Sequence, residues 1–316
     1  MSTPLDDPAT KDADAPPEPP AAGGSGRRRD PTGARRFGFQ LAGLPAVWLL
    51  LFLVLPLVML VLWSFRPPGM ASFTAAQTWT LETYRYNLGT PVFMLNLART
   101  IGTVFVIALT AVALSYPVGY LLARIAQERR YLLLSLIIAP ALVSYLLRLF
   151  AWRTLLGRGG VMNRTLLDLG LLQEPIGVFM YNRLAVIIVL TYVWIPFAAL
   201  PIFARLEQLN PRLLEASADL GATRQRTFLR VTLPLSLPGV YASFFFVFIP
   251  TLGDFATAAL VGGTTGRMFG NVIRGVVGTP DFPSAAVLSL MLFLVAAVAM
   301  YAAFRILRIK DVRQIG

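Results

Sequence analysis

The sequence of 316 residues contains no cysteine and no histidine, and only 14% of its residues are charged. Without these two side chains it has no thiolate nucleophile, disulfide, imidazole base or His/Cys metal site. Soluble domains carry about 25% charged residues, so the scarcity of charge excludes an ordinary soluble domain. Apolar residues dominate instead, at 56% of the chain, and the mean hydropathy is +0.65. The composition therefore indicates a membrane protein.

Six apolar stretches are candidates for membrane-spanning helices, each of which needs about 20 residues. Four of them lack any charged residue: Gly43 to Phe65, Thr100 to Ala123, Leu184 to Ala204 and Phe282 to Phe304. The third in chain order, Tyr131 to Leu147, continues through Arg148 and Arg153. The fifth, near Gly239 to Gly262, contains Asp254. We expect an all-α polytopic membrane protein with six transmembrane helices.

Residues 1–38 differ from the rest, being rich in Asp, Pro, Ala and Gly before a basic run. We predict a disordered tail there and a six-helix transmembrane domain over residues 39–316. A secretory signal has a shorter apolar core near the N-terminus, so the first apolar run is expected to be a retained helix.

Six spans place both termini on one side of the membrane. That side carries 18 of the 28 lysine and arginine residues, so the positive-inside rule predicts that both termini are cytoplasmic. Three connections then lie outside, each long enough for a small lid or a short helix: Arg66 to Asn96, Gly157 to Asn182 and Gly263 to Asp281. The net charge of +12 is consistent with cytoplasmic loops that contact anionic lipid, and no nucleic-acid partner is expected.

The cytoplasmic connection between the fourth and fifth spans has clear helix signals. Asn210 is a good N-cap, Pro211 suits a first helical position, and Gly221 stands where a helix would end in a left-handed turn. A second short helix is expected to begin near Thr223 and to end before Pro234. Two short helices around a glycine corner predict a protruding elbow.

The same connection has a fixed spacing: Glu215-Ala216-Ser217, three residues, Gly221, nine residues, Val231, one residue and then Leu233-Pro234. This pattern resembles the EAA signature of permease subunits of bacterial ABC importers, with Ser217 in place of the usual second alanine.

In that family the elbow, here about residues 205–238, is a coupling helix that docks into a groove on a cytoplasmic ATPase. Small and acidic side chains suit such docking. The residues implied are Glu215, Ala216, Ser217, Asp219, Gly221, Ala222, Leu233 and Pro234. An ordinary capped surface helix is the alternative, and the full spacing disfavours it.

The resemblance extends from about Arg99 to the end of the last span and is strongest to the first permease subunit of spermidine/putrescine importers. The matching stretches are Tyr116 to Arg124, Leu147 to Arg153, Ile195 to Phe197 and Phe248 to Phe255. It implies the type I permease architecture, a bacterial inner-membrane location, and a transport subunit without catalytic residues, metal or cofactor. The implied partners are a second permease, two copies of a cytoplasmic ABC ATPase, a periplasmic or external solute-binding protein, and membrane lipid.

Charged residues within the spans are candidates for the substrate path, because each costs about 2.5–3.5 kcal/mol at a helix centre. Pro250 and Gly253 are expected to break the fifth helix just before Asp254, leaving free carbonyls beside a carboxylate. Such a site suits a polyamine ammonium, to which aromatic faces add cation–π attraction. The aromatic candidates are Trp152, Tyr192 and Trp194.

Two alternatives stay open at these positions. Asp254 could pair with Arg148, and the aromatic side chains could serve packing or form an interfacial belt. If Arg148 and Arg153 face the path, a carboxylate-bearing or anionic solute such as an opine, a phosphonate or an amino-acid-like compound becomes the better candidate. A secondary transporter is a remote alternative, because it has no use for a docking elbow. A membrane enzyme is another, because the sequence has no paired-carboxylate metal motif and no nucleophile elbow.

Overall fold

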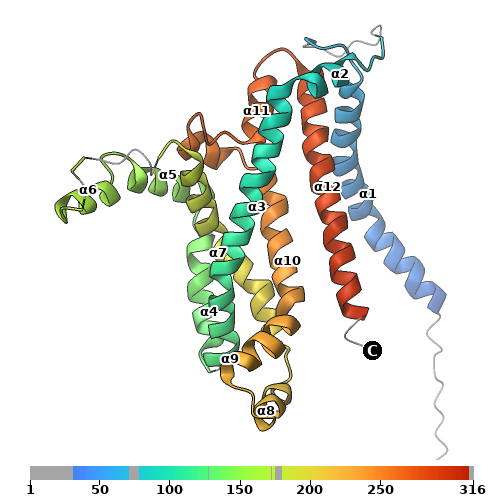
Figure 1. Ribbon diagram of the computed structural model, residues 1–316. Helices are drawn as coiled ribbons and strands as arrows, with labels where there is room; N and C mark the ends of the chain where they lie inside the picture. Colours follow the sequence, from blue (N-terminus) through green and yellow to red (C-terminus); the bar gives the residue numbers. More distant parts are fainter. Residues whose placement is uncertain (1–30, 71–77, 127, 172, 175–179, 313–316) are drawn as a thin grey trace, which may run out of the picture. The chain divides into compact units, whose positions relative to one another are not determined.

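The computed structural model describes residues 31–70, 78–126, 128–171, 173–174 and 180–312, and within these the regular elements are all helices or helical turns (Figure 1). The contacts divide the chain into two units, Met1–Leu55 and Pro56–Gly316. Helix α1 (Pro31–Ser64) crosses the boundary between them. Residues 1–30 of the predicted tail lie outside the described residues, whereas residues 31–38 are helical, because Pro31 suits a first helical position and the helix then continues without a break into the apolar run.

The second unit contains the remaining helices, whose bounds are α2 (Glu82–Gly89), α3 (Pro91–Tyr120), α4 (Arg130–Ile138), α5 (Tyr145–Leu156), α6 (Val161–Asp168), α7 (Arg183–Glu207), α8 (Pro211–Asp219), α9 (Arg224–Thr227), α10 (Leu233–Leu252), α11 (Phe269–Val277) and α12 (Phe282–Val312). Described π-helical turns are Leu121–Ile125, Phe228–Thr232 and Ala258–Gly262. The outer connections predicted from the sequence each contain a short helix, namely α2, α6 and α11.

Five helical segments of the described chain are long and apolar enough to cross a membrane. They are Val47–Ser64, Pro91–Ile125, Arg183–Glu207, Arg224–Leu252 and Phe282–Ile306. Each overlaps a predicted span, so the prediction of an all-α membrane protein is confirmed.

The predicted third span is bent rather than straight. Arg130–Leu142 and Tyr145–Asp168 meet at 83°, and Figure 1 shows α5 and α6 leading away from the end of α4. Pro140 lies in a 3-10 turn after α4, and the backbone is then extended at Val143, with Ser144 as the N-cap of α5. Proline has no N–H to donate, so Pro140 removes one hydrogen bond from the helix, and the chain leaves the α-helix at this point. The pair counts as a sixth span only if its two arms are taken together.

The core of the second unit lies between α3, α7 and α10, whose mutual contacts are the most extensive among the described helices. Its fully buried side chains include Val104 and Ile107 of α3, Val189 of α7 and Val247 of α10. Glycine lets these helices approach closely near the elbow. A Cβ on Gly239 of α10 would lie 2.7 Å from Arg205 Cβ and 2.8 Å from the Pro201 carbonyl oxygen on α7.

Candidate functional site

The predicted elbow begins with helix α8, which is capped as the sequence indicates. The Asn210 side chain accepts a hydrogen bond from the Arg212 backbone N–H at 3.0 Å, and Pro211 is the first helical residue. The cap satisfies one of the N–H groups that a helix start leaves without a partner. Figure 1 shows α8 at the end of the bundle, next to α9.

The corner after α8 is a left-handed turn at Gly221, where φ is +77°. The N–H groups of Gly221 and Ala222 donate to the carbonyls of Ala218 and Ser217 at 2.8 and 3.1 Å, closing the helix end. No atom lies within 4 Å of where a Gly221 Cβ would be. The requirement for glycine here is therefore one of backbone conformation and not of space.

The second half of the elbow differs from its prediction. Thr223 caps α9, its hydroxyl accepting from the Arg226 N–H at 3.4 Å, but the helix does not end before Pro234. It continues through the π-helical turn Phe228–Thr232 into α10, where Pro234 occupies the first turn. The wider turn changes the hydrogen-bond register just before the proline, so the missing N–H of Pro234 does not stop the helix.

The residues that resemble the coupling signature are largely accessible. Glu215, Ala216 and Asp219 are exposed, and Leu220 at the C-cap is 88% exposed. Ser217 is half-buried, and its hydroxyl lies 3.0 Å from that of Thr227, which ties α8 to α9. Of the other residues implied by the signature, Ala222 and Leu233 are half-buried, while Gly221 and Pro234 are exposed. The signature residues thus include exposed small and acidic side chains on a hydrogen-bonded frame, and the exposed Arg212, Arg224, Arg226 and Arg230 also belong to the elbow.

The helix of the fifth span breaks where the sequence predicts, just before Asp254, although the predicted span extends to Gly262. Helix α10 stops at Leu252, and the half-buried carboxylate of Asp254 accepts hydrogen bonds from the Tyr145 hydroxyl and from the Thr257 backbone N–H, the latter at 3.0 Å. The Tyr145 hydroxyl also lies 2.6 Å from the Thr257 hydroxyl. Sequence reasoning missed Tyr145 and Thr257, since no local signal relates two residues 112 positions apart.

The Asp254–Arg148 ion pair, one of the two alternatives left open by the sequence, does not appear among the described residues. Arg148 instead lies with its guanidinium carbon 6.0 Å from the Tyr145 ring centre, and its buried Nε has no hydrogen-bond partner among the described residues. Tyr145, Arg148 and Trp152 recur at helical spacing, on one side of α5. Arg153 is exposed and lines a separate pocket with Arg158.

The aromatic candidates form two groups rather than one. Trp152 and Tyr192 meet edge to face at a ring-centre distance of 5.1 Å, bringing α5 onto α7. Trp194 contacts Phe197 and Phe246 instead, at 5.8 and 6.3 Å. Both tryptophans also pack against the apolar core, so a packing role accounts for their contacts. Tyr192, which is 40% exposed, keeps part of its ring free.

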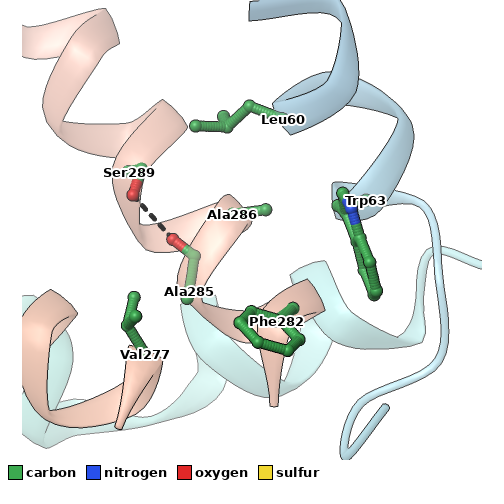
Figure 2. Close-up of a pocket in the computed structure, with 7 residues that line it drawn as sticks. All are labelled: Leu60, Trp63, Val277, Phe282, Ala285, Ala286 and Ser289. Atoms are coloured by element: carbon green, nitrogen blue, oxygen red, sulfur yellow. Dashed lines mark hydrogen bonds between the residues drawn. The ribbon is translucent and has the colours of Figure 1, made fainter. Parts of the chain in front are cut away.

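Two further pockets do not include Asp254 among their lining residues. Figure 2 shows a mostly apolar pocket of about 320 Å³, in which the Ser289 hydroxyl donates to the Ala285 carbonyl at 2.8 Å. Its lining residues are Leu60, Trp63, Val277, Phe282, Ala285, Ala286 and Ser289. A second pocket, of about 460 Å³, contains Arg267, Asn271 and Arg274. The first offers no charge to an ionic solute, and the second offers only positive charge.

Comparison with curated proteins shows relatives over most of the chain. The spermidine/putrescine transport system permease protein PotB of Escherichia coli strain K12 is 34% identical over 265 residues, which cover 84% of this chain and 95% of the relative. The protein of the same name from Haemophilus influenzae is 32% identical over 259 residues, covering 82% and 90% of the two chains.

Solved structures show the same fold. A bacterial ABC transporter that imports the acidic polysaccharide alginate matches with a TM-score of 0.68 and 19% identity, covering 88% of this chain and 97% of the other. The MetNI methionine ABC transporter matches with a TM-score of 0.54 and 20% identity, covering 68% and 94%. These matches confirm the type I permease architecture.

The model of the family described as binding-protein-dependent transport system inner membrane component matches residues 26–314. Its members are transport subunits and not enzymes, so the membrane-enzyme alternative is set aside, as is the secondary transporter. The chain belongs to this family: it is a multi-pass inner-membrane permease of an ABC importer, related to the spermidine/putrescine permeases.

Proposed function

We propose that this permease carries a polyamine, putrescine or spermidine, across the inner membrane in an ATP-driven importer. The observation that carries the proposal is the 34% identity, over 84% of the chain, to proteins named as spermidine/putrescine permeases. The site chemistry agrees with it. Asp254 supplies a carboxylate at a helix break, and polyamines are cations that a carboxylate attracts.

The elbow is proposed to be the coupling element. Its exposed small and acidic side chains, Glu215, Ala216 and Asp219, are suited to a groove with a basic rim on a cytoplasmic ATPase. Two ATPase copies, a second permease and an external solute-binding protein complete the proposed assembly, with membrane lipid around it. If α8 binds the two ATPase states unequally, ATP binding shifts the permease between its inward-open and outward-open states.

The proposed orientation places both termini, and the tail over residues 1–38, in the cytoplasm. The asymmetry of lysine and arginine between the two sides supports it. The elbow is then cytoplasmic, and Asp254 lies on the outer side of the fifth span.

Uptake of labelled putrescine and spermidine tests the substrate. Cells lacking this gene are compared with the same cells carrying it, with and without ATP depletion, after the protein has been detected in the membrane. Restored uptake that depends on ATP supports the proposal. No restored uptake of either polyamine, with the protein present, refutes the polyamine and leaves the permease assignment intact.

Arg148 favours a second candidate, an amino-acid-like solute with both an ammonium and a carboxylate. Its buried Nε lacks a hydrogen-bond partner in the described part of the chain, and Tyr145 lies between it and Asp254. A zwitterion could engage both charges, whereas a polyamine would meet one of them with like charge. Competition distinguishes the two: excess unlabelled amino acids or opines inhibit uptake of a zwitterionic substrate, and excess spermidine inhibits that of a polyamine.

A further inference from the structure

Two arginine side chains make hydrogen bonds at the two ends of the elbow, where the chain leaves α7 and where it enters α10. Arg124, in the π-helical turn after α3, donates from Nη2 to the carbonyl oxygen of Leu209 at 3.2 Å. Leu209 is the residue directly before the Asn210 cap of α8. Arg205, in the last turn of α7, donates from Nε to the carbonyl oxygen of Leu235 at 3.2 Å, in the first turn of α10.

The surroundings of both bonds are tightly packed. Leu209 is 8% exposed and belongs to an apolar cluster with Leu122 and Leu206, so the acceptor of Arg124 is held in place. The stem of Arg205 lies against Gly239, where a side chain would lie 2.7 Å from the arginine Cβ. Guanidinium groups on carbonyl oxygens form charge-assisted hydrogen bonds, which are stronger than neutral ones.

Aromatic contacts add a third attachment on the same side. The Phe228 ring lies edge to face with Tyr116 and Tyr120 of α3, at 5.9 and 5.8 Å. The Tyr116 hydroxyl also lies 2.9 Å from that of Ser236 on α10. By contrast, the contacts of α8 within the chain are chiefly with the rest of the elbow, namely α9 and the turn that follows it.

We infer that Arg124 and Arg205 are positioning residues that transmit elbow movement to α3, α7 and α10. The inference rests on the proposed docking of the elbow on an ATPase. A displacement of the elbow reaches the helix bundle only if the connections between them are rigid. These two hydrogen bonds fix the backbone where the chain enters the elbow and where it leaves it. Without them, α8 could follow the ATPase while the bundle stays where it is.

The test uses the complete importer in which the permease carries Arg124→Gln or Arg205→Gln. Glutamine keeps a neutral N–H donor but lacks the positive charge of the guanidinium group. Arg129→Gln is the matched control, since Arg129 is exposed and its side chain makes no hydrogen bond or ion pair with the described residues. Arg124→Lys keeps the charge with a single donor group and should retain part of the nucleotide-dependent change in labelling that serves as the readout.

The readout needs no knowledge of the solute. The chain has no native cysteine, so Ala259→Cys, at an exposed position near Asp254, gives this chain a single reactive site. Its labelling rate by a membrane-impermeant maleimide is measured with and without a non-hydrolysable ATP analogue. Copurification of the ATPase with the tagged permease is measured in parallel.

We expect the ATPase to copurify with every variant, while the nucleotide-dependent change in labelling falls roughly tenfold in Arg124→Gln and Arg205→Gln. It should stay at the wild-type value in Arg129→Gln. A full nucleotide response in both glutamine variants overturns the inference, as does a wild-type chain that binds the ATPase but shows no nucleotide response. Failure of the unsubstituted permease to bind the ATPase overturns the proposed docking itself, and the inference with it.

Discussion

Asp254 is held by donors from two parts of the chain that are far apart in sequence. Tyr145 belongs to α5, beyond the bend of the third span, while Thr257 follows Asp254 after the end of α10. The carboxylate therefore connects the bent span to the broken one. A solute that binds Asp254 would compete with the tyrosine hydroxyl for it.

Asp254→Asn should raise the KM for a cationic solute roughly ten- to hundredfold, because a charge-assisted contact worth about 1.5–3 kcal/mol becomes a neutral one. The amide oxygen still accepts from Tyr145 or Thr257, so the amount of protein in the membrane should not change. Initial uptake rates over a range of solute concentrations measure the effect. Asp168→Asn, at an exposed position on α6, is the control. An unaltered KM in Asp254→Asn would assign Asp254 a structural role only.

Gly221→Asp should abolish transport without reducing membrane insertion. A side chain at φ +77° costs about 1–2 kcal/mol, and the aspartate adds bulk beside the proposed docking surface. Gly221→Ala carries the backbone cost alone and should retain part of the activity. Uptake and immunodetection in membranes check this, with Gly275→Ala, where the added methyl meets open space, as control. Normal uptake by Gly221→Asp would remove the corner from the mechanism.

At the scale of helices, the contact of α7 with α10 depends on the absence of a side chain at Gly239. The Pro201 carbonyl oxygen would lie 2.8 Å from a Cβ there, closer than real contacts allow. A backbone oxygen cannot rotate away as a side chain can. The two helices would have to separate next to the Arg205–Leu235 bond.

Gly239→Val should therefore destabilise the permease by about 1–3 kcal/mol, the range typical of overpacked cores. The thermal unfolding midpoint of the purified protein in detergent measures the loss. Gly102→Ala on α3, which has no neighbouring atom within 4 Å of the added methyl group, should leave the midpoint unchanged or raise it. Equal midpoints for Gly239→Val and the wild type would mean that α7 and α10 separate without cost.

Local signals predicted individual helices better than the contacts between them. Asn210, Pro211 and Gly221 predicted the start and end of α8 because capping depends on neighbours in sequence. The 83° bend was missed although Pro140 is visible in the sequence, since a proline can also be absorbed, as Pro234 is by the π-helical turn beside it. Which outcome follows depends on what packs around the proline.

The partners of Asp254 were beyond sequence reasoning for a different reason. Pairing with Arg148 was an alternative that charge alone left open, but the structure places Tyr145 beside Asp254. Arg148 is one helical turn further along α5, and the direction of the bend before α5 contributes to which of the two side chains reaches Asp254. A single sequence does not contain the direction of that bend.

At the scale of the whole molecule, the family assignment shows that this is a multi-pass inner-membrane protein. Its proposed orientation can be tested with single cysteines, because the sequence has none of its own. Leu220 is 88% exposed at the elbow, and Arg158 is exposed in the connection between α5 and α6. The proposed orientation places these two residues on opposite sides of the membrane.

Single cysteines at these positions should react from opposite sides. In cells whose outer membrane is made permeable, Arg158→Cys should react with a membrane-impermeant maleimide. Leu220→Cys should react with it only after the inner membrane has been permeabilised as well. The cysteine-free wild-type chain is the control for background labelling. Reaction of Leu220→Cys in cells with an intact inner membrane would invert the proposed orientation.

The π-helical turn Phe228–Thr232 holds one more residue than an α-helical turn, and it lies between the elbow and the fifth span. Deleting one of its five residues should restore a regular helix instead of breaking it, because the bulge takes up the extra residue locally. The docking residues would then keep nearly the same direction relative to α10. Deleting a residue from a regular turn of α10 would instead rotate the elbow by about 100° and draw it in by about 1.5 Å. In this connection, the place of a missing residue matters as much as its identity.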